Sequence, residues 1–277
     1  MTQPIARVAA SVAAADQVTV LTGAGISTES GIPDYRGPNG AWTTNPASMR
    51  LVDIDAYLTD PQVRRDAWQE RLHHAAWTAS PGPGHSALVD LERTGKLRAL
   101  ITQNIDGLHQ AAGSSPGIVR ELHGTIRLSQ CLDCGHETPM REQLDRVVAG
   151  ELDPPCRVCG GIQKSATVAF GQSLDPDVLH LAREAAAACQ VFLAVGTSLQ
   201  VQPAARLCDT ALEAGAQLVI VNAEPTPYDH SAAAIIRGSI GEVLPMITRS
   251  SQEVGTVTND EAEPSFDANS YPKGHID

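Results

Sequence analysis

Four short runs of apolar residues stand out along the chain, and each ends in glycine or polar residues. They are Val18–Thr22, Leu97–Thr102, Val191–Val195 and Gln217–Val221. Runs of this length, rich in branched aliphatic residues and without regular polar alternation, are typical of strands buried on both faces of a parallel sheet. The pattern therefore predicts four buried parallel strands.

Helical patterns of apolar and polar residues accompany these runs. An alanine-rich pattern covers residues 1–15, and three more cover Ser86–Arg93, Asp177–Ala188 and Ala204–Ala214. Strands that alternate with helices predict a doubly wound α/β sheet. Ligands of such sheets bind beyond the carboxyl ends of the strands, which is where this sequence places its glycines and isolated polar residues.

Three stretches depart from this alternation. Residues 38–80 contain all three tryptophans and predict a small, mostly helical insertion. Residues 127–164 have few long apolar runs, so we expect that this stretch has too few core residues to fold without an additional stabilising interaction. Residues 249–277 carry six acidic and two basic residues among scattered apolar ones, which predicts a disordered tail.

Composition narrows the class of protein. The chain has 277 residues, 42% of them hydrophobic, which suffices for one sizeable core and a smaller module. A formal net charge of -12 argues against a surface built for nucleic acid or anionic membrane. No apolar run approaches the roughly 20 residues that span a bilayer, and the N-terminus lacks the apolar core of a secretory signal. We expect a soluble, cytoplasmic protein.

Six cysteines point to a metal. Four of them form two CxxC pairs: Cys131 and Cys134, Cys156 and Cys159. In a reducing compartment such pairs favour metal binding over disulfides, and four thiolates predict a closed, structural zinc site with no open position for water. Cys189 and Cys208 lie in alanine-rich helical stretches, so we expect them to be small buried core residues.

Glycines follow the first apolar run in the segment GAGIS, residues 23–27. Glycine after a strand lets the backbone approach a phosphate group and point amide donors at it. The spacing departs from G-x-G-x-x-G because Thr28 occupies the sixth position. Taken alone, the segment fits a tight turn as well as a nucleotide-binding loop.

Polar residues also follow the other three runs. Asn104 and Asp106 come after the second run, where they fit an amide ring substituent and ribose hydroxyls, although Asp106 fits a helix cap equally well. The segment GTS, residues 196–198, follows the third run, and Asn222 and Glu224 follow the fourth. These residues suit phosphate and ribose groups or plain strand-ending turns.

One of the nine histidines, His123, precedes a glycine in the segment ELHG, residues 121–124. A histidine in that setting suits a general base near neutral pH. On its own, a solvated or capping histidine fits the pattern better, so the neighbouring motifs carry the hypothesis.

Together these motifs resemble the sirtuin family of NAD-dependent protein deacylases, over roughly residues 18–245. The matching segments occur in one order: GAGIS through SGIPDYRG (23–37), TQNIDGLH (102–109), LHG (122–124), the two CxxC pairs, VAFGQ (168–172), VGTSLQVQPA (195–204) and VNAE (221–224).

The resemblance assigns roles to matching residues. His123 would be the catalytic base, and Val168, Phe170 and Gly171 would lie beside a substrate peptide that adds as a strand between two chain segments. NAD would be held by sixteen residues of the strand ends and adjoining loops: Gly23, Ala24, Gly25, Asp34, Tyr35, Arg36, Gln103, Asn104, Ile105, Asp106, Gly196, Thr197, Ser198, Asn222, Glu224 and Ile240.

The resemblance also implies a domain organisation. Residues 1–126 and 165–248 would form a Rossmann-type NAD-binding domain, with a helical insertion at about residues 41–78. Residues 127–164 would form a small module around one structural Zn²⁺ and supply one wall of the substrate cleft.

The activity implied is removal of acyl groups from lysines of other proteins, with NAD consumed and nicotinamide and O-acyl-ADP-ribose released. The acyl oxygen attacks the nicotinamide ribose, and His123 takes a proton from a ribose hydroxyl. A mono-ADP-ribosyltransferase using the same NAD site is the alternative, and an NAD-sensing or zinc-ribbon binding module is a third hypothesis. We expect acyl-lysine proteins or peptides as partners, and neither nucleic acid nor membrane.

Three positions depart from the pattern of the family. Tyr35 stands where many members have phenylalanine, and Gln172 replaces a frequent acidic residue. Members that favour negatively charged acyl groups carry Tyr-x-x-Arg in the helical insertion, where this chain has Trp68-x-x-Arg71. Arg71 would suit a carboxylate, but we favour a surface charge at Arg71 with Trp68 in the core, which leaves the acyl preference open.

Overall fold

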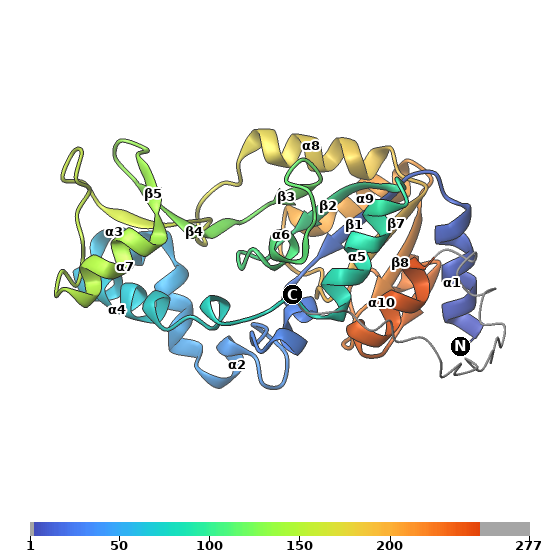
Figure 1. Ribbon diagram of the computed structural model, residues 1–277, viewed down its shortest axis with the longest axis horizontal. Helices are drawn as coiled ribbons and strands as arrows, with labels where there is room; N and C mark the ends of the chain where they lie inside the picture. Colours follow the sequence, from blue (N-terminus) through green and yellow to red (C-terminus); the bar gives the residue numbers. More distant parts are fainter. Residues whose placement is uncertain (1–2, 250–277) are drawn as a thin grey trace, which may run out of the picture.

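A six-stranded parallel sheet, ordered β3-β2-β1-β7-β8-β9, forms the centre of the molecule in the computed structural model, which describes residues 3–249 (Figure 1). Its four inner strands have the bounds that the apolar runs predict, so that prediction is confirmed. They are β1 (Val18–Thr22), β2 (Leu97–Thr102), β7 (Val191–Val195) and β8 (Gln217–Val221). Most of the tail expected to be disordered, residues 250–277, lies outside the described residues.

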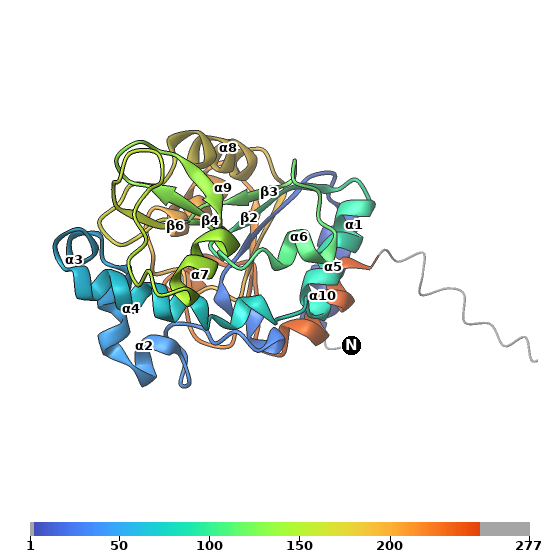
Figure 2. The ribbon, with the colours of Figure 1, turned by 60° about the vertical axis from the view of Figure 1, so that its left-hand side comes forward.

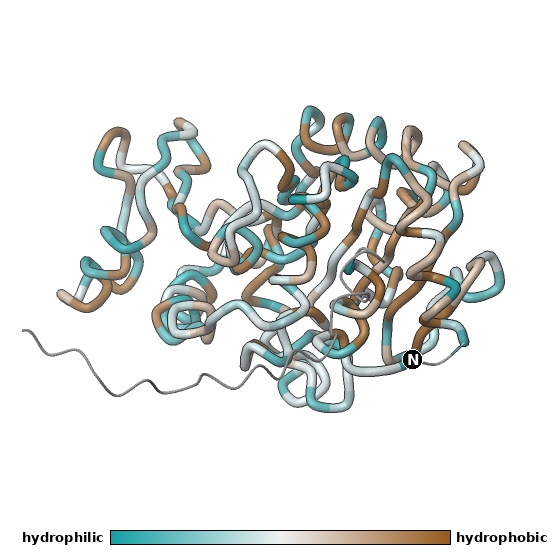
Figure 3. Tube along the Cα trace, turned by 45° about the vertical axis from the view of Figure 1, so that its right-hand side comes forward, coloured by the Kyte–Doolittle hydropathy of each residue, from teal (hydrophilic) through white to brown (hydrophobic). Residues whose placement is uncertain are grey.

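Alternate residues of the inner strands enter two apolar layers, one on each side of the sheet. On β7, Leu193 belongs to the first layer and Phe192 to the second, and both are fully buried. Figure 3 shows hydrophobic residues concentrated along these strands. The helices that complete the first layer are α1 (Gln3–Ala14), α5 (Pro83–Arg93) and α10 (Ile240–Thr248), and those that complete the second are α8 (Pro176–Ala187) and α9 (Leu207–Glu213).

Local chemistry sets the helix ends. Helix α8 begins with proline in its first turn, where no amide donor is needed, and the Asp175 carboxylate accepts from the amides of Asp177 (2.8 Å) and Val178 (3.2 Å). The pattern expected as one helix at 204–214 is a 3₁₀ turn, η4 (Ala204–Arg206), followed by α9. Cys189 and Cys208 are buried beside α8 and within α9, as expected.

The outer strands of the sheet escaped the sequence patterns. β3 (Val119–Glu121) and β9 (Ala234–Ile236) have three residues each, which is too short for a run or an alternation to stand out. β3 pairs with β2 and β9 with β8, both in parallel. None of the helices between residues 3 and 249 combines the length and hydropathy that crossing a bilayer requires.

The tryptophan-rich insertion is mostly helical, which confirms the expectation for this stretch. The fully buried Trp68 packs against Met140, Leu144 and Val147 of α7 (Met140–Val148), so the insertion and the cysteine-rich stretch share a core. The elements of the insertion are the helices α2 (Ala41–Thr44), α3 (Ile54–Thr59) and α4 (Pro61–Leu72) and the 3₁₀ helices η2 (Pro46–Val52) and η3 (Ala75–Trp77).

The cysteine-rich stretch contains a second, antiparallel sheet of three strands, ordered β5-β4-β6. The strands are β4 (Gly124–Cys131), β5 (Glu137–Pro139) and β6 (Gln163–Thr167). Figures 1 and 2 show this sheet and α7 beside α3 and α4, at the end of the molecule away from α1.

The loops after β1 and β7 touch through their main chains. The Gly23 amide donates to the Val195 carbonyl (3.0 Å), and the Gly25 amide donates to the Gly196 carbonyl (2.9 Å). A Cβ on Gly25 would lie 2.8 Å from the Gly196 Cα and 2.9 Å from its carbonyl oxygen. Glycine at 25 is therefore a steric requirement of this contact.

We expect Gly25→Ala to lower the free energy of unfolding by about 1–3 kcal/mol, because the added methyl must push two backbones apart. Denaturant titration measures this change. Gly117→Ala is the matched control, since no atom lies within 4 Å of a Cβ at that position. Equal stability of the two variants would contradict the contact.

Candidate active site

The residues expected at the strand ends meet at one edge of the main sheet. Because β1, β2, β7 and β8 are parallel, their carboxyl ends face the same way. The turn η1 (Ala24–Ser30) follows β1 at this edge, and Gly196–Ser198 follow β7. The structure thus brings together segments that lie about 80 to 170 residues apart in the sequence.

Hydrogen bonds join the segment after β2 to the loop after β1. The Asn104 amide Nδ2 donates to the Gly23 carbonyl and to the Ser27 hydroxyl, both at 3.2 Å. The Ser27 hydroxyl donates in turn to Asp106 Oδ2 (2.8 Å). The other carboxylate oxygen of Asp106 accepts from the Leu108 amide (2.9 Å) at the start of α6 (Leu108–Ala112), although Gly107 is the residue at the cap position of that helix. Asn104 and Asp106 are both buried.

Gln103 connects three segments and sets the state of His123. Its amide Nε2 donates to the Thr197 hydroxyl (2.8 Å), and its carbonyl lies 2.9 Å from His123 Nδ1. A carbonyl only accepts, so Nδ1 carries the proton and Nε2 of a neutral ring keeps a free lone pair. Burial lowers the pKa of His123, and the Gln103 carbonyl partly opposes that shift. The ring is therefore neutral and basic at pH 7.

An aromatic cluster joins the loop at residues 34–36 to the segment at 168–171. Trp42 lies 4.5 Å from the Tyr35 ring and 5.4 Å from the Phe170 ring, centroid to centroid. The Arg36 guanidinium stacks 4.7 Å above the Trp42 ring. The Asp34 carboxylate accepts from the Gly37 amide (2.7 Å) and shapes the loop. The sequence did not predict that Trp42 belongs to the candidate site.

The segment at 168–171 passes directly beside His123. The Val168 amide donates to the His123 carbonyl (2.9 Å). The Phe170 amide and carbonyl are bonded to Val52 and Ile54 (2.8 and 3.0 Å), and the Phe170 side chain remains 40% exposed. Gly171 has a φ of 87°, a conformation that favours glycine.

The remaining candidates lie after β8, at the start of α10 and, for Ile105, after β2. Asn222 is buried, and its side-chain amide donates to the Glu224 carbonyl (2.8 Å), whereas Glu224 itself is exposed. Ile240 is the first residue of α10 and is buried in the apolar layer beside Gly84. Ile105 packs against a small core under the insertion, and its carbonyl accepts from the Ile126 amide.

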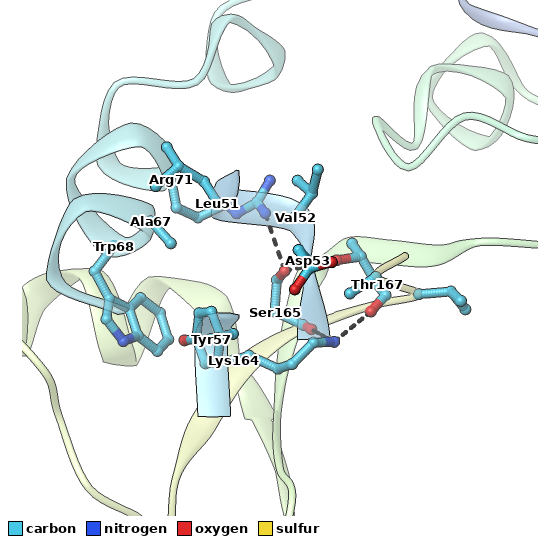
Figure 4. Close-up of a pocket in the computed structure, with 12 residues that line it drawn as sticks. Leu51, Val52, Asp53, Tyr57, Ala67, Trp68, Arg71, Lys164, Ser165 and Thr167 are labelled. Atoms are coloured by element: carbon cyan, nitrogen blue, oxygen red, sulfur yellow. Dashed lines mark hydrogen bonds between the residues drawn. The ribbon is translucent and has the colours of Figure 1, made fainter. Parts of the chain in front are cut away.

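The expectation that Arg71 is a surface charge is wrong. The exposed fraction of Arg71 is only 9%, and its guanidinium donates to the Ser165 hydroxyl on β6 (3.1 Å), as Figure 4 shows. Trp68 lies in the core, as expected. The sequence could not show that Arg71 is covered by a strand more than 90 residues away.

The sequence also did not predict a buried group of polar side chains beneath the strand ends, formed by His109, Thr22 and Thr102. His109 Nε2 lies 2.9 Å from the Thr22 hydroxyl, which donates to the Thr102 hydroxyl (2.8 Å). Burial, with a smaller contribution from His85, lowers the pKa of His109 to about 3, so the ring stays neutral. In the sequence, His109 ends the segment TQNIDGLH, and nothing in that segment predicts that the ring is buried.

The two CxxC pairs converge on one point. The four Sγ atoms all lie within 4.8 Å of one another, with 3.5 Å between Cys131 and Cys159 and 3.8 Å between Cys134 and Cys156. Four sulfurs around a zinc ion at about 2.3 Å would be about 3.8 Å apart. The Val158 amide also faces the Cys156 sulfur (3.4 Å). The donor set and its spacing fit a tetrahedral zinc ion.

Comparison with known proteins agrees with this geometry. The model of the Sir2 family matches residues 23–203. NAD-dependent protein deacetylase 2 of Streptomyces coelicolor is 55% identical over 232 residues, which are 84% of this chain and 96% of that protein. The chain belongs to the Sir2 family.

Other relatives of this Sir2 chain bear names of the same kind. NAD-dependent protein deacylase 2 of Pyrobaculum aerophilum is 41% identical over 82% of this chain and 88% of its own length. A structure that describes the mechanism and regulation of Sir2 enzymes has a TM-score of 0.81 and 41% identity, over 90% of this chain and 97% of that one. A Sir2 structure with a p53 peptide and NAD⁺ has a TM-score of 0.78 and 32% identity, over 89% and 96%.

We expect Cys131→Ser to lose the metal and to unfold at lower temperature, because ligand binding at such a site contributes folding free energy. Metal content per chain and a thermal melt measure both effects. Cys189→Ser is the matched control, because this buried thiol donates to the Ala186 carbonyl and lies outside the group of possible metal ligands found among residues 3–249. One equivalent of zinc retained in Cys131→Ser would overturn the assignment of the four-cysteine site.

Proposed function

We propose that this Sir2-family chain is an NAD-dependent protein-lysine deacylase that releases nicotinamide and an O-acyl-ADP-ribose. One observation carries the proposal: the Gln103 carbonyl holds a neutral His123 at the edge of the sheet where Asn104 and Asp106 also lie. A base and a set of ribose-binding groups are thus available in one place. Relatives named as NAD-dependent deacetylases support the same conclusion.

NAD is the co-substrate in this proposal, held at the carboxyl ends of β1, β2, β7 and β8. The glycine-rich turn after β1 suits the pyrophosphate, because Ala24 and Gly25 are only half-buried and glycine lets a phosphate group approach the backbone closely. Gln103–Asp106 suit the nicotinamide and its ribose, and Asn222 and Glu224 suit the second ribose. The loop at 34–36 would lie over the cofactor, and Thr197, Ser198 and Ile240 would complete its surroundings.

His123 acts as the general base. The acyl oxygen of the substrate displaces nicotinamide from the ribose, and a ribose hydroxyl then adds to the acyl carbon. That hydroxyl must lose a proton, which the free Nε2 of His123 accepts. Addition of water to the acyl carbon completes the transfer, with free lysine and O-acyl-ADP-ribose as products.

The substrate is an acyl-lysine in an extended segment of another protein. Val168, Phe170 and Gly171 would lie beside it, and strand addition would supply main-chain hydrogen bonds independent of its sequence. Sir2 structures bound to acetylated and to propionylated peptides support this substrate class.

The metal has a structural role in the proposal. Zinc at the four cysteines would hold residues 127–164 as a small module that packs on the helical insertion of the NAD-binding domain, which is formed by residues 1–126 and 165–248. The four thiolates require a reducing environment, which supports a cytoplasmic place of action. An ADP-ribosyltransferase acting through the same NAD site is the competing function that the first experiment separates.

We expect His123→Ala to fold normally and to deacylate about 10²- to 10⁴-fold more slowly, because the proton acceptor is lost. Mass spectrometry of an acetyl-lysine peptide incubated with NAD measures the reaction. His180→Ala is the control, since His180 is an exposed residue of α8. Full activity of His123→Ala would refute the role of base, and gain of ADP-ribose by the target with the acyl group retained would favour the transferase.

The pH profile tests the state of His123. Its pKa lies below the usual value of 6.5, so the basic form is present at neutral pH and is lost as the pH falls through that lowered pKa. We expect kcat/KM for the acyl-peptide to stay constant near pH 7 and to decline only below about pH 6.5. A half-maximal point above pH 7 would contradict this assignment.

A further inference from the structure

The turn η1, which follows β1 at the proposed NAD site, is joined to the start of α10 by one side chain. Glu29 lies near the end of η1, and its Oε1 accepts from the Ser239 hydroxyl (2.8 Å) and from the Gly241 amide (3.1 Å). Glu29 and Ser239 are 210 residues apart in the sequence. The motifs of the chain do not predict this contact, and the proposed mechanism does not use it.

These hydrogen bonds supply what the first turn of α10 lacks. The first amides of any helix have no partner within it and carry a partial positive charge. At α10 the Ser239 hydroxyl accepts from the Glu242 amide (3.2 Å), and the Glu29 carboxylate takes the Gly241 amide. Glu29 is therefore held at the helix end by two hydrogen bonds and by a favourable interaction between its charge and the helix dipole.

Glycine at position 241 leaves room for this carboxylate. A Cβ at Gly241 would overlap Glu29 Oε2, so the methyl group of alanine would displace the Glu29 side chain. That side chain is exposed and can turn into solvent, so the displacement would break the contact without disturbing the core. Alanine is otherwise the better helix former, which means that glycine here favours the contact rather than the helix.

Apolar contacts bring the same two segments together against α5. Helices α5 and α10 lie side by side (Figures 1 and 2). In the first turn of α5, a Cβ on Gly84 would lie 3.0 Å from the Ile240 side chain and 3.2 Å from the Ile26 side chain of η1. Ile26 and Ile240 belong to one apolar layer. Apolar packing has no preferred direction, whereas hydrogen bonds do, so the contact of Glu29 is what fixes the orientation of η1 relative to α10.

Both joined segments belong to the proposed NAD site. Ala24 and Gly25 at the start of η1 would face the pyrophosphate, and Ile240 at the start of α10 would complete the surroundings of the cofactor. A carboxylate in a loop that takes a pyrophosphate repels that group, so the charge of Glu29 by itself weakens NAD binding. The contact with α10 gives the residue a purpose that offsets this repulsion, because it sets the spacing between the two segments.

We propose that Glu29 is a positioning residue of the NAD site, which holds the glycine-rich turn at a fixed distance from α10. The proposal rests on the deacylase function, since it takes NAD to bind at this edge of the sheet. Glu29 acts through Ser239 and Gly241 and takes no part in the chemistry. A site that is ordered beforehand loses less entropy on binding, so the contact increases the affinity for NAD and leaves the rate of the chemical step unchanged.

ADP-ribose measures the affinity without turnover, because it has the pyrophosphate and both riboses of NAD but no nicotinamide. We expect Glu29→Ala to raise the Kd for ADP-ribose about 5- to 10-fold in calorimetric titration of the full chain, which is the effect of losing one or two hydrogen bonds. Loss of the negative charge alone would act in the opposite direction. Binding that is unchanged or tighter in Glu29→Ala would therefore overturn the positioning role.

Further variants assign the effect to the contact. Glu29→Gln keeps an oxygen that accepts hydrogen bonds and should lose less affinity than Glu29→Ala. Gly241→Ala should raise the Kd as much as Glu29→Ala while its unfolding temperature stays the same or rises, and the double variant should lose no more than either single one. Glu242→Ala removes an exposed charge from the same helix turn and should change the Kd by less than about twofold. Additive losses in the double variant, or an equal loss in Glu242→Ala, would overturn the assignment.

The outcomes separate this proposal from the deacylase function. Binding of ADP-ribose that neither Glu29→Ala nor Gly241→Ala weakens would overturn the positioning role and leave the function in place. Weaker binding in both variants, with no NAD-dependent loss of acyl groups in the unaltered chain, would support the positioning role and overturn the deacylase function. In turnover of an acetyl-lysine peptide, we expect Gly241→Ala to raise KM for NAD and to keep kcat within about twofold of the unaltered chain. A fall in kcat at an unchanged KM would contradict the positioning role.

Discussion

The main-chain contact between the loops after β1 and β7 is the constraint on which the site depends. β1 lies at the point where the strand order changes direction: the chain continues through β2 and β3 on one side and through β7, β8 and β9 on the other. Doubly wound sheets open a crevice at such a point. Because Gly25 and Gly196 have no side chains, the two loops meet closely and leave their polar neighbours facing one edge.

The candidate base depends on the same edge. The Gln103 carbonyl that orients His123 belongs to the residue directly after β2, and the Gln103 side chain is held by Thr197 after β7. The tautomer of the histidine is thus fixed by a backbone group, which substitution of a side chain cannot remove.

The sequence predicted the inner sheet well because β1, β2, β7 and β8 are buried on both faces and appear as apolar runs, with only Arg98 of β2 and Gln217 of β8 exposed. It missed β3 and β9, since three residues paired on one side carry no periodicity of their own. For the site, the strand-end residues and His123 were predictable from motifs, although their roles stay proposals.

The sequence could not predict which residues are buried by segments far away along the chain. Arg71 stands among charged residues of α4, and only the fold places Ser165 and Lys164 beside it. Lys164 belongs to a short strand of the cysteine-rich stretch, where a lysine is unremarkable. The aromatic contacts of Trp42 with Tyr35 and Phe170 likewise join three segments that no local pattern connects.

The pairing of Gly124 with Thr167 brings the two ends of the cysteine-rich stretch side by side. A Cβ at Gly124 would lie 2.1 Å from the Ala166 carbonyl oxygen, so the two strands form a tight neck next to His123. The stretch beyond this neck shares a core with the helical insertion through Trp68, so the two would have to change together. With that pairing kept, the fold lets evolution vary the recognition surface while the neck and the strand ends beside His123 stay in place.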